Sequence, residues 1–167
     1  MTDHYVDWEK TQYVLGFLFS PDKRRVILIR KSKPAWQAGM LNGIGGKVEY
    51  NESIVDAMRR EWVEETNCDS PLWQHRVTMI GENDGGWQVW VFSAISPSHE
   101  WFEQIPRGFE LPQEEPVVAV SRDYFASNII DAIPNLRWLV PLCADEHLNP
   151  AITYRPVIVR EIRKDRA

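Results

Sequence analysis

The chain has 167 residues, 44% of them hydrophobic and 26% charged, and its formal net charge is -5. These values are typical of a globular protein with a substantial core, and we expect a single domain over residues 1–167. The negative charge argues against a nucleic-acid duplex or an anionic membrane as partner. Two cysteines are too few for a disulfide framework, and we expect neither a membrane-spanning run nor a signal peptide, so the sequence predicts a reducing, cytoplasmic location.

Two strands joined as a hairpin are predicted after a polar segment over residues 1–11. The first strand is the apolar run Tyr13–Phe19, which a Ser-Pro-Asp turn closes, and the second is Arg25–Lys31. Arg30 and Lys31 end the second strand, so we expect them close to the glycine-rich turn that follows.

A loop and a glycine-rich turn come next, over residues 32–46. Trp36 lies in the loop, where it either stacks on a base or covers the core. Asn42 and Gly43 alone would be an ordinary turn. Gly45 and Gly46 have no side chain, so the backbone there can come close to whatever lies over the carboxylates of the next helix.

An amphipathic helix is predicted from Ser53 to about Thr66. Ser53 and Asp56 have the spacing of a capping box. One stripe of this helix begins apolar and ends in acids, and its members are Ile54, Ala57, Met58, Glu61, Glu64 and Glu65.

The three glutamates at the end of this stripe cost the helix stability. Like charges three or four residues apart repel, and negative charge at a helix C-terminus opposes the helix dipole. Two carboxylates about 5 Å apart repel by roughly 3 kcal/mol at an effective dielectric constant of about 20. A hard divalent cation such as Mg²⁺ would offset this cost, because it takes oxygen ligands and bridges carboxylates to phosphates. The alternative interpretation is a solvated acidic face.

The segment resembles the Nudix box, Gly-x5-Glu-x7-Arg-Glu-U-x-Glu-Glu-x-Gly-U, in which U is a bulky apolar residue. Over residues 46–68 its fixed positions are occupied by Gly46, Glu52, Arg60, Glu61, Glu64 and Glu65, with Trp62 and Cys68 at the U positions. Asn67 replaces the last glycine, and Asn is the next best residue for the left-handed conformation that ends such a helix. The wider segment Asn42–Glu49 looks like the MutT-type and oxidised-purine triphosphatase branch.

The resemblance implies an α/β protein with the Nudix fold, an α/β/α sandwich around a mixed central sheet. It implies Mg²⁺-dependent hydrolysis of a nucleoside diphosphate linked to another group, with Mn²⁺ able to substitute. The implied metal ligands are Glu61, Glu64, Glu65, the Gly45 carbonyl and one loop carboxylate, Glu115 first and Glu114 second. Water activated by the metal then attacks a bridging phosphorus, with Glu64 or a loop glutamate as general base. Arg60 belongs to the catalytic set of the box, although we expect it mainly to hold helix and loop together with Glu52.

The substrate contacts implied by the resemblance lie around the glycine turn, at Asn42, Gly46, Lys47, Arg30, Trp36 and Asn135. A basic residue near Arg30 or Lys31 contacts phosphate in the family, and a solvated basic pair is the alternative. Asn42 would hydrogen-bond the purine, with Asn135 across the same pocket mouth, since an amide offers both donor and acceptor. Otherwise Asn42 only shapes a turn and Asn135 only caps a helix.

A second hairpin, a long loop, a helix and two strands are predicted in the rest of the chain. The hairpin consists of Leu72–Ile80 and Trp87–Ala94, joined by a turn over residues 83–86. The later elements are a loop over 96–116, a short strand at 117–120, a turn or short helix at 123–133, a helix from Asn135 to about His147 that Pro141 bends or shortens, and an edge strand at 152–162.

A nucleoside triphosphate pyrophosphohydrolase is the leading predicted function, with nucleoside monophosphate and pyrophosphate as products and oxidised purines such as 8-oxo-dGTP among its substrates. Related ADP-ribose hydrolases tend to carry a proline beyond the box, and diadenosine polyphosphate hydrolases a tyrosine. At the corresponding position this chain has the segment Asn83 to Trp87, with neither proline nor tyrosine, which argues against both of these substrates. A nucleotide sensor that does not hydrolyse its ligand usually lacks box glutamates, and all of them are present here. The oligomeric state stays open.

Overall fold

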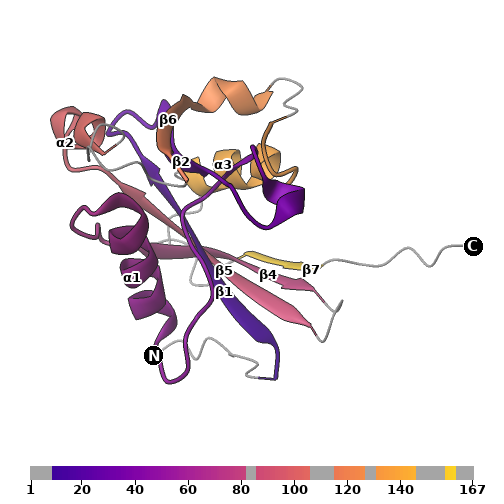
Figure 1. Ribbon diagram of the computed structural model, residues 1–167. Coiled ribbons are helices and arrows are strands. Elements are labelled where there is room, and N and C mark those ends of the chain that lie inside the picture. Colours follow the sequence, from indigo (N-terminus) through magenta and orange to yellow (C-terminus); the bar gives the residue numbers. More distant parts are fainter. Residues whose placement is uncertain (1–8, 82–85, 106–114, 127–130, 146–156, 161–167) are drawn as a thin grey trace, which may run out of the picture.

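The computed structural model describes residues 9–81, 86–105, 115–126, 131–145 and 157–160. Within them, seven strands form one mixed sheet in the order β3-β2-β1-β5-β4-β7, with β6 on the free edge of β2 (Figure 1). The strands are β1 Thr11–Phe19, β2 Arg25–Arg30, β3 Leu41–Asn42, β4 Gln74–Gly81, β5 Trp87–Ile95, β6 Val117–Ser121 and β7 Val157–Arg160. The helices are α1 Ile54–Thr66, α2 His99–Gln104 and α3 Leu136–Ala144, with short 3₁₀ turns η1 Ala35–Gln37 and η3 Arg122–Ala126.

Both predicted antiparallel strand pairs are present, β1 with β2 and β4 with β5, but the first pairing is short. Residues 83–85 of the turn predicted between β4 and β5 lie outside the described residues. β1 pairs with β2 only at Leu18–Ile27 and Phe19–Val26. Beyond these pairs the glycine turn takes the place of β2 beside β1, because the Val14 N–H donates to the Gly46 carbonyl at 2.9 Å. On its other edge β1 runs parallel to β5 along its whole length. The turn is therefore fixed to the middle of the sheet.

Two apolar layers cover the two faces of the sheet. One layer joins sheet residues to α1 and α2 through Ala57, Met58, Trp62 and Phe102. The other joins the sheet to α3 and η3 through Leu136, Leu139, Val140, Cys143 and Phe125. Figure 1 shows these helices on opposite sides of the strands. The predicted α/β/α sandwich is confirmed.

Helix α1 begins and ends where its sequence signals predict. The Ser53 hydroxyl accepts a hydrogen bond from the Asp56 N–H at 3.1 Å, which caps the first turn. Asn67 ends the helix with φ 53° and ψ 24°, the left-handed conformation that the family glycine would take. Trp62 is fully buried and its ring lies edge-on to Trp73, with 5.4 Å between the ring centres. The large U residue is therefore accommodated by packing against a second tryptophan.

Three predicted boundaries differ from the structure. The stretch expected to be a loop contains α2, whose first turn is capped by Ser98 through a hydrogen bond from the Trp101 N–H. Helix α3 ends at Ala144 instead of near His147, because the next residue, Asp145, is extended. Strand β7 is described only over residues 157–160, at the edge of the sheet and parallel to β4, so the rest of the predicted strand lies outside the described residues.

No helix among the described residues has the length and apolar character needed to cross a membrane.

Candidate active site

The glycine turn lies directly against the acidic end of α1. A Cβ on Gly46 would stand 2.4 Å from Oε1 of Glu61, and one on Gly45 would stand 2.1 Å from the Val14 carbonyl oxygen. A side chain at Gly45 would clash with fixed backbone, and one at Gly46 would displace the Glu61 carboxylate. Gly45 also donates its N–H to Oε2 of Glu65 at 3.2 Å. The close approach expected from these glycines is therefore an approach to the carboxylates of α1.

Arg60 binds the acids on one side of the turn. Its guanidinium forms a bidentate pair with the Glu52 carboxylate, at 2.8 and 2.9 Å, and donates to the Lys47 carbonyl at 3.1 Å. It also donates to Glu61 at 2.8 Å and to Glu64 at 3.2 Å. The hydrogen bond from Arg60 holds the pKa of Glu52 below its ordinary value. The tie between helix and loop expected of Glu52 and Arg60 is present.

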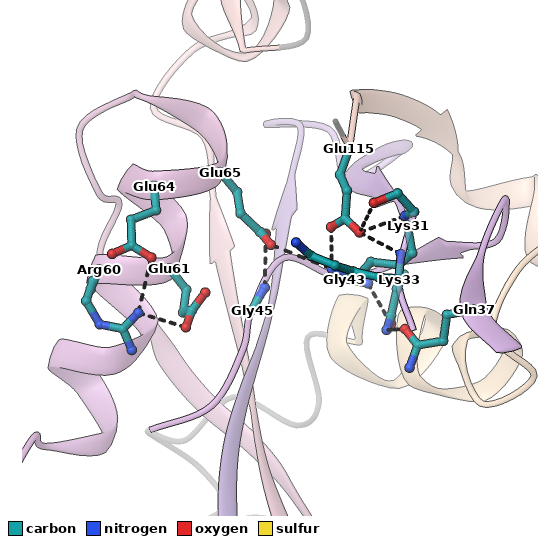
Figure 2. A network of polar contacts seen from close by, with 12 residues as sticks. Lys31, Lys33, Gln37, Gly43, Gly45, Arg60, Glu61, Glu64, Glu65 and Glu115 are labelled. Carbon is teal, nitrogen blue, oxygen red and sulfur yellow. Dashed lines mark hydrogen bonds and ion pairs between the residues drawn. The ribbon is translucent and has the colours of Figure 1, made fainter. Parts of the chain in front are cut away.

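Lys31 binds the acids on the other side of the turn (Figure 2). Its Nζ lies 2.5 Å from Oε2 of Glu115 and 3.9 Å from Oε1 of Glu65. Oε1 of Glu115 accepts from the backbone N–H groups of Ser32 and Lys33, at 2.7 and 3.2 Å. Glu115, the first choice for a loop carboxylate, is thus brought to the site across 84 positions of sequence from Lys31. Glu114 lies outside the described residues.

Burial raises the pKa values of two acids at the site, Glu65 and Glu61, more than the nearby cations lower them. Burial raises the pKa of Glu65 to about 8, and the charges of Glu61 and Glu115 add to the shift against opposition from Lys31. Burial also raises the pKa of Glu61, although Arg60 opposes it. For Glu115, burial alone would raise the pKa, but the hydrogen bonds from Lys31 and the Ser32 and Lys33 backbone outweigh it and lower the pKa.

The oxygen ligands of the site suit a hard divalent cation, although their side chains do not point to a common centre in this structure. Among the described residues no three acidic, histidine or cysteine side chains meet closely enough to hold a metal ion. Instead, Arg60 pairs with Glu52, Glu61 and Glu64, while Lys31 pairs with Glu65 and Glu115. The available ligands around the turn are oxygens, which Mg²⁺ prefers, and the raised pKa of Glu65 shows that its carboxylate would gain from a nearby cation. The residues present therefore fit a magnesium ion.

Arg30 and Lys31 point to opposite faces of the sheet. Arg30 donates to the Gly39 carbonyl at 2.6 Å and pairs with Asp131 at 3.4 Å, away from the carboxylates of α1. Ile27 and Ile29 face the α1 layer, so strand alternation places Lys31 on that face. This period of two was the signal that could have selected Lys31 over Arg30 for the site.

The loop residue Trp36 and the turn residue Lys47 are both exposed. Trp36 lies in η1 with 65% of its surface exposed, so it does not cover the core. The Lys47 side chain is exposed, while its carbonyl accepts from Arg60. Both side chains are therefore accessible from solvent and could contact a substrate.

The two predicted asparagines make different contacts. Asn42 shapes the turn, because its Oδ1 accepts from the Gly43 N–H at 2.9 Å and its Nδ2 donates to Gln37 at 3.3 Å. The prediction that Asn135 caps α3 is wrong: its backbone is already helical and its side chain makes no cap hydrogen bond. The turn starts earlier, with the Leu136 N–H bonded to the Ile133 carbonyl at 2.9 Å.

The Asn135 amide instead faces inward. Its Nδ2 contacts Sδ of Met79 at 3.9 Å, and its Oδ1 is buried without a hydrogen-bond partner. The segments that carry the two asparagines are neighbours, since Leu41 bridges Ala132. No contact within the described ranges joins the Asn42 and Asn135 side chains directly.

Comparison with known proteins agrees with this geometry. The family model described as NUDIX domain matches residues 10–92. The mutator MutT protein from Bacillus halodurans superposes with a TM-score of 0.60 at 19% identity, over 81% of this chain and 83% of that one. A Nudix-family hydrolase from Clostridium perfringens gives a TM-score of 0.58 at 16% identity, over 80% and 95% of the two chains. No curated protein matches the sequence. The chain belongs to the Nudix family and is a hydrolase that acts on phosphoanhydride bonds of nucleotides.

Proposed function

We propose that the protein is a Mg²⁺-dependent pyrophosphohydrolase of nucleoside triphosphates that releases nucleoside monophosphate and pyrophosphate. Purine nucleotides, oxidised ones such as 8-oxo-dGTP included, are the proposed substrates. The observation that carries the proposal is the gathering of acids around one glycine turn, with Glu61, Glu64 and Glu65 on α1 and Glu115 just before β6. Both cysteines are free, in keeping with the proposed cytoplasmic location.

Each acid has a proposed role in holding metal or water. Nudix hydrolases generally use divalent metal ions. Glu61, Glu65, Glu115 and the Gly45 carbonyl would hold Mg²⁺, with Glu64 at the rim. The bound ion would neutralise phosphate charge and lower the pKa of a coordinated water.

Glu64 is the proposed general base. Its side chain is 57% exposed, against 13% for Glu61 and 17% for Glu65, so it is the acid of α1 with the best access to water. Arg60, which donates to both Glu61 and Glu64, is a positioning residue that holds these carboxylates apart from Glu65.

Recognition of the base is assigned to the asparagines and Trp36. The buried Oδ1 of Asn135 is an acceptor that no described group satisfies. Leaving such a group unpaired costs about 1–3 kcal/mol. An N–H of a base would offset this cost once the amide, which faces inward beside Met79 in the structure, turns outward. Trp36 is exposed enough to stack on a ring.

A panel of nucleotides tests the proposal. The panel contains ordinary and oxidised nucleoside triphosphates, ADP-ribose and diadenosine polyphosphates, each with Mg²⁺ and the purified full chain. We expect the highest kcat/KM for a purine triphosphate, with pyrophosphate as a product. A preference for ADP-ribose or a dinucleotide would replace the substrate assignment. Binding without turnover of any member would identify a sensor.

Asn42→Ala separates base recognition from turn formation. If Asn42 contacts the base, the variant changes the ratio of kcat/KM between nucleotides by about 1–3 kcal/mol, because an unpaired polar group discriminates between ligands. If Asn42 only shapes the turn, all nucleotides lose activity alike and the melting temperature falls. A uniform loss across the panel would refute the base-reading role.

A further inference from the structure

We propose that Lys31 is a resident counterion that competes with the divalent metal for Glu65 and Glu115, and so sets the affinity of the metal-free enzyme for metal. This role rests on the proposed metal site, but it concerns a state that precedes substrate binding.

Lys31 pairs with both acids, and all three side chains are largely buried. The Lys31, Glu65 and Glu115 side chains are only 15%, 17% and 12% exposed. Charges removed from water to this extent destabilise a fold unless they are paired. Figure 2 shows Glu65 reaching from α1 and Glu115 from the opposite side, with the Lys31 ammonium between them. The lysine therefore stands where a cation is needed.

The charge balance makes the lysine a competitor of the metal. Once both carboxylates are ionised, as metal binding requires, one ammonium leaves a net charge of about -1, so Lys31 compensates only part of the pair. A divalent ion bound to the same carboxylates would reverse the sign and repel the ammonium. The same side chain that stabilises the metal-free site therefore weakens its first contact with metal.

Lys31 is the exchangeable cation of the site, whereas Arg60 is fixed. Arg60 is held by two bonds to Glu52 and one to the Lys47 carbonyl, none of which involves an assigned metal ligand. The Lys31 backbone is fixed by hydrogen bonds with Met40 and Gly39. Its ammonium, in contrast, forms ion pairs only with Glu65 and Glu115 among the described residues. A flexible stem lets that ammonium leave for a phosphate when metal arrives.

Metal binding without nucleotide tests this role. The probe is Mn²⁺ alone, titrated into the full chain by calorimetry and by electron paramagnetic resonance. We expect Lys31→Met to bind Mn²⁺ about tenfold more tightly or better than the wild type, a difference of about 1.4 kcal/mol or more. Lys31→Gln, which keeps a donor toward Glu115 but no charge, should show the same direction and covers the case in which Lys31→Met does not fold.

Arg30→Met is the matched control, because it removes the neighbouring positive charge from the opposite face of the sheet, where that charge pairs with Asp131. Its Mn²⁺ affinity should equal that of the wild type. The metal-free melting temperature should fall in Lys31→Met and recover on adding Mn²⁺.

Two results would overturn the proposal and can be told apart. An unchanged or weaker Mn²⁺ affinity in the Lys31 variants, with a wild type that binds Mn²⁺, would refute the competition alone. A wild type that binds no Mn²⁺ would remove the proposed metal site itself.

Discussion

Helices α1 and α3 cover opposite faces of one sheet, and their inward faces differ in chemistry. Helix α3 turns an entirely apolar face inward, at Leu136, Leu139, Val140, Cys143 and Ala144. Helix α1 also buries residues along its length, from Ala57 to Thr66, but one stripe of it continues from apolar residues into carboxylates held by Arg60 and Lys31. In α3 the buried face contributes only to stability. In α1 the same stripe must also carry repelling charges, so stability and function oppose each other there.

Leu139→Ala should produce the largest change in stability and should leave the chemistry of α1 intact. Leu139 is fully buried in the α3 layer, and truncating such a side chain costs about 2–5 kcal/mol through lost burial and the cavity that remains. Denaturant unfolding with and without Mg²⁺ should give the same loss. Turnover per folded molecule should stay near the wild-type value. A large drop in turnover of the folded variant would show that the α3 layer shapes the active site.

Glu65→Gln should produce the opposite pattern. Loss of a metal ligand should reduce turnover at least tenfold to hundredfold, since even changes behind the ligands reach that size. The fold should survive, because the carboxylate charge is unfavourable where it lies. Turnover at saturating Mg²⁺ and thermal melting check both expectations, with Glu100→Gln on the exposed face of α2 as control. Near-normal turnover would rule out the assigned metal site.

The local signals of α1 explain why the sequence predicts it so well. Ser53, Asp56 and Asn67 act within one turn of the ends that they define, and the bond from the Asp56 N–H to the Ser53 hydroxyl and the left-handed Asn67 are those expected from sequence. The apolar runs of β1, β2 and β5 are equally visible, because a buried strand needs no partner to be recognised in sequence. The resemblance of residues 46–68 to the Nudix box then supplies the order of layers.

Contacts between distant segments account for what the sequence does not predict. Glu115 meets Lys31 only because β6 pairs with β2, a register that no local pattern encodes. Asn135 looks like a helix cap by residue type, yet its amide turns toward Met79 because the helical turn begins before it. Helix α2 is short, and the acids and prolines around it masked the Ser98 cap.

Stability should depend on pH through the acids of α1, because the buried face of α3 carries no acid. The folded protein holds a proton on Glu65, whose pKa is about 8, while the unfolded chain releases it near the ordinary value of 4.5. Metal-free stability should therefore be greatest below the unfolded value and fall as pH rises through about 5 to 8, by up to about 1.4 kcal/mol per pH unit. Glu61, whose pKa is also raised, acts in the same direction.

Unfolding in a chelator from about pH 5 to about pH 9 measures this slope. The fall of stability with pH should be smaller in Glu65→Gln and unchanged in Leu139→Ala. The lowered pKa values of Glu52 and Glu115 act only at more acidic pH, so they do not obscure it. A stability that rises over this range would contradict the assignment of Glu65 as a buried, proton-binding acid.

Glu64→Ala should have the smallest effect on stability. Glu64 is 57% exposed and pairs with Arg60 at 3.2 Å, and an exposed pair of this kind contributes only about 0.3–0.5 kcal/mol. Relief of repulsion from the neighbouring glutamates should offset it, so we expect the metal-free stability to stay the same or rise slightly, and likewise in Glu61→Ala. A clear fall in the metal-free melting temperature of either variant would show that the Arg60 contacts outweigh the repulsion.

The central claim is that the acids around the glycine turn form a metal-dependent hydrolytic site. The most direct test is pyrophosphate release from a purine nucleoside triphosphate by the wild type, first in a chelator and then after Mg²⁺ is returned. We expect turnover to vanish in the chelator and to recover with Mg²⁺, with nucleoside monophosphate as the second product and the protein folded throughout. Turnover that persists in the chelator would contradict the claim.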